Sequence, residues 1–128
     1  MSAPQRLLII DDQEAIVFAM ADYLSSLGYE VDAARNAYEA LGLLAHGEYS
    51  LVLADLRLDP EDTRGGLDVL RVAREHCRST PLILLTAYDS TEVEAQVREL
   101  GSVLLLSKPQ PLARIGEQIG RLLAPPCV

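Results

Sequence analysis

Acidic, hydroxyl and ammonium side chains follow several short apolar segments of this sequence. Asp11 and Asp12 follow the first segment, and Asp55, Thr86 and Lys108 stand at the ends of three later ones. Crowded carboxylates repel one another unless a cation neutralises them, and oxygen ligands of this kind suit Mg²⁺ or Mn²⁺. A bound metal leaves room for a phosphoryl group, which one carboxylate can accept as an acyl phosphate. The lysine and threonine would then stabilise the new phosphoryl oxygens.

Each of these residues also has an ordinary structural explanation. Asp11, Asp12 or Thr86 could cap the amino end of a helix, and Lys108 could be a solvated surface residue. Two adjacent aspartates beside a third strand-end aspartate favour a metal site, because a motif in its expected context outweighs an isolated match. Lys108 is the only lysine of the chain and precedes a proline. We therefore interpret all of these residues as functional.

Five apolar segments have the length of strands, and segments of helical periodicity follow them. The expected strands are residues 7–10, 31–34, 51–54, 82–85 and 103–106. Gly28, Gly47 and Gly101 end three of the expected helices. The apolar residues at helical spacing are Ile16, Met20, Leu24 and Leu27; Tyr38, Leu41 and Leu44; Leu67, Leu70, Ala73 and Cys77; Val93, Val97 and Leu100; and Leu112, Ile115, Ile119 and Leu122.

Five strands alternating with five helices predict a parallel sheet covered by helices on both faces, which is a doubly wound α/β fold. Residues 30–34 alternate like an edge strand, which fits the flavodoxin-like strand order 2-1-3-4-5. In this architecture ligands bind at the carboxyl ends of the strands, where the polar residues above converge.

The expected second edge strand, residues 103–106, is wholly apolar, which is a liability for an exposed edge. We therefore expect Leu105, together with the helices before and after this strand, to form a contact surface for a second copy or another partner. Gly116 and Gly120 in the last helix are expected to allow close packing of that partner.

The composition favours one globular domain over residues 1–128, since 49% of the residues are hydrophobic and 23% are charged. Eleven basic and nineteen acidic residues give a net charge of −8, which opposes binding to nucleic acid or an anionic membrane. Cys77 and Cys127 lack metal-ligand spacing and suit free thiols in a reducing cytoplasm. Neither a transmembrane segment nor a signal peptide is evident, so we expect a cytoplasmic protein.

Four motifs together resemble the bacterial response-regulator receiver domain. The resemblance implies a phosphoacceptor switch of two-component signalling, in which Asp55 accepts phosphate from a sensor histidine kinase or a phosphotransfer protein. It implies no enzyme beyond self-phosphorylation from small donors and autodephosphorylation. The motifs are Leu7-Leu-Ile-Ile-Asp-Asp, Leu51-Val-Leu-Ala-Asp55, Leu82-Ile-Leu-Leu-Thr86-Ala87 and Lys108-Pro109.

The resemblance also implies roles for individual residues. Asp12, the Asp55 carboxylate and the Arg57 backbone carbonyl would ligate Mg²⁺, with Asp11 assisting directly or through water. Phosphorylation would draw Thr86 toward Asp55 and shift the surface formed by the fourth helix, the fifth strand and the fifth helix.

Three features depart from the family pattern. Leu105 occupies a position where the family usually has an aromatic residue. The loop over residues 58–65 is about three residues longer than expected by analogy. Gln110 follows Lys108-Pro109, where the family often has phenylalanine.

Other classes of function remain open at this point. A Mg²⁺-dependent phosphohydrolase of the haloacid dehalogenase type also combines aspartates, threonine and lysine, although those enzymes carry an Asp-x-Asp pattern and not an adjacent pair. A pseudo-receiver that only binds protein is a further alternative, as is flavin binding, which rests on fold alone. The chain is expected to be a stand-alone receiver or the amino-terminal part of a longer regulator.

Overall fold

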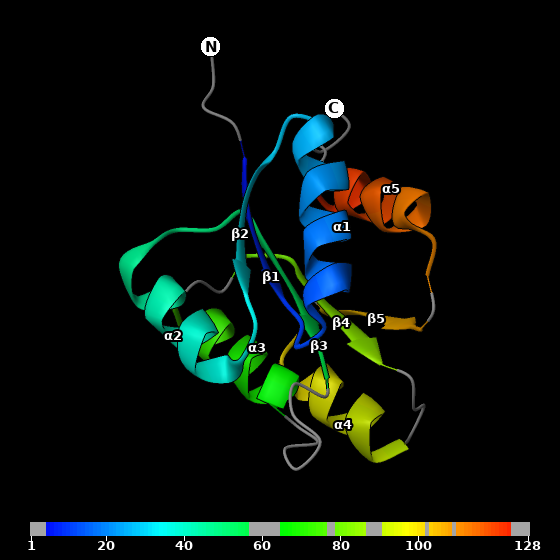
Figure 1. Cartoon of the computed structure of the whole chain (residues 1–128). Coiled ribbons are helices and arrows are strands. Elements are labelled where there is room, and N and C mark those ends of the chain that lie inside the picture. The colour runs from blue at the N-terminus through cyan, green and yellow to red at the C-terminus, as the bar shows by residue number, and fades with distance from the viewer. Residues whose placement is uncertain are drawn as a thin grey trace, which may run out of the picture.

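The computed structural model describes residues 5–56, 65–76, 79–86, 91–101, 103–108 and 110–123. Within them, strands and helices alternate, and five parallel strands form one sheet in the order β2-β1-β3-β4-β5 (Figure 1). This arrangement confirms the predicted doubly wound, flavodoxin-like fold. The strands are β1 (Arg6–Ile10), β2 (Glu30–Ala34), β3 (Leu51–Asp55), β4 (Leu82–Thr86) and β5 (Val103–Ser107). The helices are α1 (Glu14–Ser26), α2 (Ala37–His46), α3 (Gly65–His76), α4 (Thr91–Glu99) and α5 (Leu112–Leu123).

Two hydrophobic cores lie on opposite faces of the sheet. In β1, Leu7 and Ile9 belong to the core under α1 and α5, whereas Leu8 and Ile10 belong to the core under α2, α3 and α4 (Figure 1). All four side chains are fully buried. Burial on both faces is the reason that the central strands are continuously apolar.

The edge strand β2 carries polar residues because most of its side chains are only partly buried or exposed. Asp32 of β2 accepts a hydrogen bond from the Tyr49 hydroxyl at 2.7 Å and forms an ion pair with Arg6 at 3.2 Å. Burial, followed by the hydrogen bond and the charge of Asp32, raises the pKa of Tyr49 above its usual range. These contacts tie β2 to β1 and to the segment that leads into β3.

Two helices end at glycines with positive φ, as the sequence predicts. Gly28 follows α1 with φ of 102°, and Gly101 follows α4 with φ of 86°. Only glycine adopts this left-handed backbone without strain, so both residues terminate their helices and turn the chain toward the next strand.

Helix α2 forms where the sequence predicts it, but it buries only part of the apolar set that marks it. Leu44 is buried, whereas Tyr38 is 88% exposed and Leu41 is 39% exposed. The buried residues of α2 are Ala40 and Leu44, which lie one turn apart. An apolar residue at helical spacing is therefore not always on the buried face of its helix.

The predicted role of Gly116 in packing a partner helix is also wrong. A Cβ atom on Gly116 would lie 2.9 Å from a ring carbon of Tyr23 and 3.1 Å from Leu27 Cδ1. Both residues belong to α1 or its carboxyl end, so the close approach is between α5 and α1 of the same chain. A Cβ atom on Gly120 would meet no described residue beyond its own helix within 4 Å.

Candidate functional site

The carboxyl ends of four parallel strands bring the predicted polar residues to one edge of the sheet. Asp11 directly follows β1, Asp55 and Thr86 are the last residues of β3 and β4, and Lys108 directly follows β5. Asp11, Asp55 and Thr86 are buried, with 1%, 6% and 2% of their surface exposed. The neighbouring Asp12 is exposed. The buried polar groups thus lie next to an exposed carboxylate, that of Asp12, at the rim of the site.

Lys108 connects the two buried aspartates. Its Nζ lies 2.8 Å from Asp55 Oδ2 and 3.4 Å from Asp11 Oδ2. Its backbone N–H donates to the Thr86 carbonyl oxygen at 2.8 Å, which extends the pairing of β4 and β5 by one residue. Burial lowers the pKa of the Lys108 ammonium, but hydrogen bonds and charge from Asp55 and Asp11 outweigh burial and raise the pKa. The lysine is therefore held as a cation at the centre of the site.

Local hydrogen bonds fix the backbone that carries Asp11. Its N–H donates to the Ala34 carbonyl oxygen at 3.1 Å, and its Oδ1 accepts from the Gln13 N–H at 2.9 Å. The N-cap residue of α1 is Gln13 and not one of the aspartates. One Asp11 oxygen thus serves the turn before α1, while the other faces Lys108.

Three carboxylates converge at this site. Asp11, Asp12 and Asp55 each offer an oxygen, and these oxygens lie within 4.8 Å of one another. Desolvation, the hydrogen bond and charge of Asp11, and the charge of Asp55 raise the pKa of Asp12. Two ligands on opposite sides of one Mg²⁺ stand roughly 4 Å apart, so the spacing and the oxygen chemistry both fit this ion.

Some predicted residues lie outside the part of the chain that the structure describes. They include Arg57, most of the lengthened loop 58–65, Ala87 and Pro109. Gln110 is described, and its Nε2 donates to the Ser107 carbonyl oxygen at 2.7 Å.

Gly66 is a contact of Asp55 that the sequence pattern did not reveal. In the sequence this glycine directly precedes Leu67, the first apolar residue of the third expected helix, and glycine is a poor helix former. In the structure the Gly66 N–H donates to the Leu56 carbonyl oxygen at 3.1 Å, which holds the start of α3 against the end of β3.

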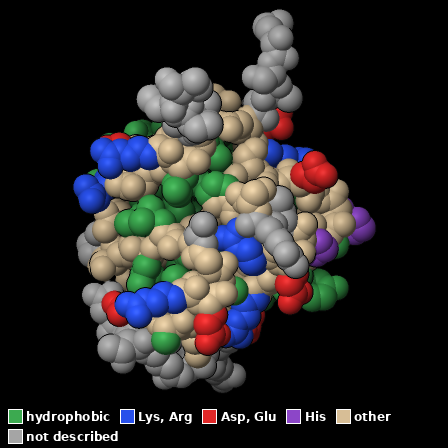
Figure 2. Space-filling model, turned by 180° about the vertical axis from the view of Figure 1, so that it is seen from behind, with side chains coloured by type: hydrophobic (Ala, Val, Ile, Leu, Met, Phe, Trp, Pro, Cys, Tyr) green, Lys and Arg blue, Asp and Glu red, His purple; other side chains and the backbone are tan. Residues whose placement is uncertain are grey.

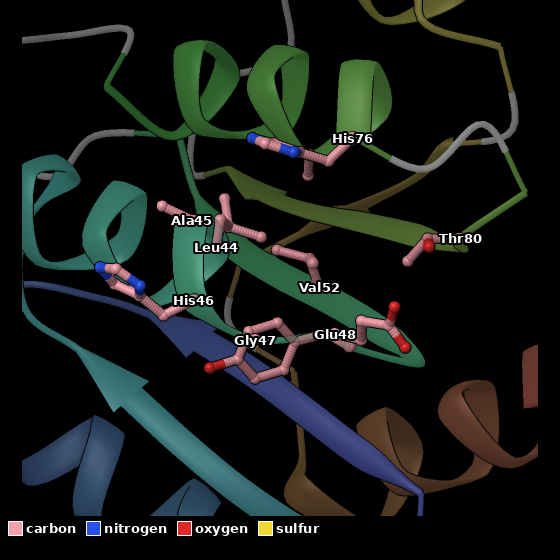
Figure 3. A pocket seen from close by; sticks show the side chains of 10 residues that line it. Leu44, Ala45, His46, Gly47, Glu48, Val52, His76 and Thr80 are labelled. Atoms are coloured by element: carbon pink, nitrogen blue, oxygen red, sulfur yellow. The ribbon is translucent and has the colours of Figure 1, made fainter.

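A separate pocket of about 520 Å³ lies at the opposite end of the sheet (Figure 3). Its floor includes Val52, and its sides include His46 and His76 at the ends of α2 and α3. The two histidines therefore lie far from the acidic residues.

Comparison with known proteins identifies the family to which the chain belongs. The family model for the response regulator receiver domain matches residues 7–120. The chain therefore belongs to this family of regulators of two-component signalling. No helix in the described part of the chain has the length and apolar character needed to cross a membrane.

Individual relatives agree with this family assignment. The chain is 33% identical to the response regulator protein PilR of Pseudomonas aeruginosa over 93% of this chain and 26% of that protein. It is 37% identical to the transcriptional regulatory protein DltR of Streptococcus agalactiae over 86% of this chain and 50% of that protein. The chain thus spans between about a quarter and a half of the length of these relatives.

The fold matches that of solved receiver domains. A CheY-like response regulator receiver domain protein from Methanospirillum hungatei aligns with a TM-score of 0.87 and 28% identity over 94% of each chain. The signal receiver domain of an HD domain-containing protein from Pseudomonas fluorescens aligns with a TM-score of 0.83 and 30% identity, over 94% of this chain and 95% of that one.

Proposed function

We propose that this receiver domain, taken as one domain over residues 1–128, is a phosphoacceptor switch in which Asp55 receives the phosphoryl group. The observation that supports this most strongly is the 2.8 Å contact between Lys108 Nζ and Asp55 Oδ2, with Asp11 and Asp12 beside them. The donor is a sensor histidine kinase or a phosphotransfer protein.

The transfer forms one bond and breaks another. An Asp55 carboxylate oxygen attacks the phosphorus atom, the bond between phosphorus and the leaving atom of the donor breaks, and the leaving group keeps the electron pair. Lys108 then pairs with a phosphoryl oxygen instead of Asp55, and the Thr86 hydroxyl moves toward another oxygen.

Asp11, Asp12, the Asp55 carboxylate and the Arg57 backbone carbonyl would hold Mg²⁺ or Mn²⁺. When bound, the ion supplies positive charge that neutralises the phosphoryl oxygens. The buried Asp11 oxygen also keeps Lys108 oriented toward the reacting carboxylate.

Incubation with acetyl phosphate, followed by intact-mass measurement, tests the assignment of Asp55. We expect one phosphoryl group per chain with Mg²⁺ present and none in EDTA or in an Asp55→Asn variant. Labelling of Asp55→Asn at the wild-type level, or labelling that EDTA does not reduce, would contradict the proposal.

The phosphohydrolase alternative has no support in the family assignment. A turnover assay with small phosphate esters separates the two functions. A phosphohydrolase releases many phosphates per chain, whereas a phosphoacceptor retains one and releases it slowly.

The face formed by α4, β5 and α5 is proposed as the contact surface for a second copy of the chain. Leu105 on the edge strand β5 is only partly buried, and Leu122 of α5 is 38% exposed. Hydrophobic side chains gather on the side of the molecule seen in Figure 2. Apolar surface of this kind is typical of interaction sites.

Sedimentation of the wild type and of Leu105→Glu, with and without beryllofluoride as a phosphate mimic, tests this contact. We expect beryllofluoride to induce a dimer of the wild type and not of the variant. A wild type that stays monomeric in both conditions would contradict the dimer and leave the role of Asp55 untouched.

A further inference from the structure

Gly66, in the first turn of α3, lies against the backbone of Asp55. A Cβ atom on Gly66 would lie 1.9 Å from the Asp55 carbonyl oxygen, 2.6 Å from its carbonyl carbon and 2.9 Å from Leu56 Cα. Ordinary van der Waals contact begins at 3.4 Å. The atoms that a side chain would meet all belong to the backbone, so no change of rotamer relieves the overlap. This close approach requires glycine.

Both elements at this contact are held in place from elsewhere. Asp55 lies opposite Leu85 in the β3–β4 register, and the Leu56 N–H donates to the Leu85 carbonyl oxygen at 2.8 Å. Helix α3 is anchored by buried side chains, among them Leu67. A side chain at residue 66 would therefore force a shift at the contact itself, where the Asp55 peptide meets the first turn of α3.

The geometry of the site depends on that peptide. The Asp55 carboxylate must stay within reach of Lys108 and of the oxygens of Asp11 and Asp12. Misplacement of about 1 Å at a reacting centre lowers rates on the order of a hundredfold. Loss of the groups that orient metal ligands weakens metal binding roughly tenfold to a hundredfold.

We propose that Gly66 is a positioning residue for the phosphoacceptor. The missing side chain lets α3 close onto the Asp55 carbonyl group and thereby sets where the Asp55 carboxylate stands. This inference rests on the proposed function of Asp55. It assigns a role to Gly66, which contacts the Asp55 peptide backbone and none of the carboxylates.

A comparison of Gly66→Ala with Gly116→Ala tests the inference. Both variants add a methyl group at a tightly packed helical glycine, but the Gly116 methyl group meets Tyr23 and Leu27, away from Asp55. Three readouts are taken: the Mg²⁺ dissociation constant, the phosphorylated fraction with acetyl phosphate, and the ¹³Cε signal of labelled lysine at fixed pH without metal. Lys108 is the only lysine, so that signal reports on the site alone.

We expect Gly66→Ala to remain folded by circular dichroism, to bind Mg²⁺ roughly tenfold or more weakly and to lose most phosphorylation. Its Lys108 signal should shift, because the contact with Asp55 changes. Gly116→Ala should lose stability yet keep the wild-type Mg²⁺ affinity and Lys108 signal.

Several results would overturn the inference. They are wild-type Mg²⁺ affinity and Lys108 signal in Gly66→Ala, an equal loss of Mg²⁺ affinity in both variants, or unfolding of Gly66→Ala while Gly116→Ala folds. The last result would assign Gly66 to the fold instead of the site. Failure to phosphorylate the wild-type protein would instead contradict the proposed function of Asp55.

Discussion

At the scale of single residues, the site combines one half-buried cation with carboxylates that differ in exposure. Lys108 is paired with the buried Asp55 and Asp11, whereas Asp12 stands at the exposed rim. The ion pairs of Lys108 and the exposed carboxylate of Asp12 therefore contribute to stability with opposite signs. Lys108 stabilises its neighbours, and Asp12 is repelled by them.

Replacement of Asp12 by asparagine should stabilise the metal-free protein. The pKa of Asp12 is raised in the folded state, so the folded protein binds this proton more tightly than the unfolded chain, and ionisation of Asp12 opposes folding. In EDTA at pH 7 we expect Asp12→Asn to raise the free energy of unfolding by no more than about 1 kcal/mol, because solvent screens an exposed charge.

Urea unfolding at several pH values measures this effect. The difference between Asp12→Asn and the wild type should shrink as the pH falls and vanish well below 3.8, the ordinary pKa of an aspartate, because the Asp12 carboxyl group is then protonated in both the folded and the unfolded state. A lower stability of Asp12→Asn at pH 7 would contradict repulsion at this site.

Lys108 should titrate above its ordinary pKa of 10.5, since Asp55 and Asp11 together raise the pKa of its ammonium group. Its contribution to stability is complete below pH 10.5 and is lost as the pH rises through the raised pKa. The single lysine ¹³Cε signal follows this titration in the metal-free protein. Asp55→Asn should lower the midpoint, and an unchanged midpoint in that variant would mean that Asp55 does not hold the ammonium group.

At the scale of elements, the packing of each helix depends on the face that it buries and on the glycines in and beside it. Helix α2 packs through Ala40 and Leu44 and leaves Tyr38 exposed. Helix α5 approaches α1 at Gly116. Gly42 in α2 differs from these contacts, because a Cβ atom there would meet no described residue beyond its own helix within 4 Å.

Gly42→Ala should therefore stabilise the protein. Alanine restricts the unfolded chain and favours the helix, and the expected gain is about 0.4–1 kcal/mol in the free energy of unfolding. Gly28→Ala is the matched control, since Gly28 also has open space but a φ of 102°. That variant should lose stability in the same urea titration, and equal effects of the two substitutions would contradict the argument.

At the scale of the whole molecule, the sheet couples residues far apart in the sequence into one acidic site. The carboxyl ends of β1 and β3 bring Asp11 and Asp55 together, and β5 adds Lys108. Because this arrangement exists only in the folded chain, a cation that binds it must also stabilise the fold.

Mg²⁺ should raise the melting temperature at constant ionic strength. At a concentration about a hundred times its dissociation constant, a ligand that binds only the folded state adds about 2.7 kcal/mol of stability. Differential scanning calorimetry measures the increase, with potassium as the control salt. We expect Asp12→Asn to show a smaller increase, and an equal increase in the two proteins would exclude Asp12 from the metal site.

Local patterns in the sequence were sufficient for the strands, most of the helices and the residues at the strand ends. A strand buried on both faces is continuously apolar, as β1 and β3 are, and a helix that must end turns through a glycine such as Gly28 or Gly101. The order of parallel strands then brings Asp11, Asp55 and Lys108 to one edge. The strands and helix ends depend on neighbours in the chain, and the strand order follows from general rules for parallel sheets, so the sequence alone was enough to predict both.

Only the tertiary structure decided which surfaces meet. The exposure of Tyr38, the packing of Gly116 on Tyr23 and the contact of Gly66 with the Asp55 carbonyl group were not evident from periodicity. Each depends on how a helix is rotated and how closely two backbones approach. Those quantities follow from the packing of side chains that are distant in sequence, and close packing makes them sensitive to a single methyl group.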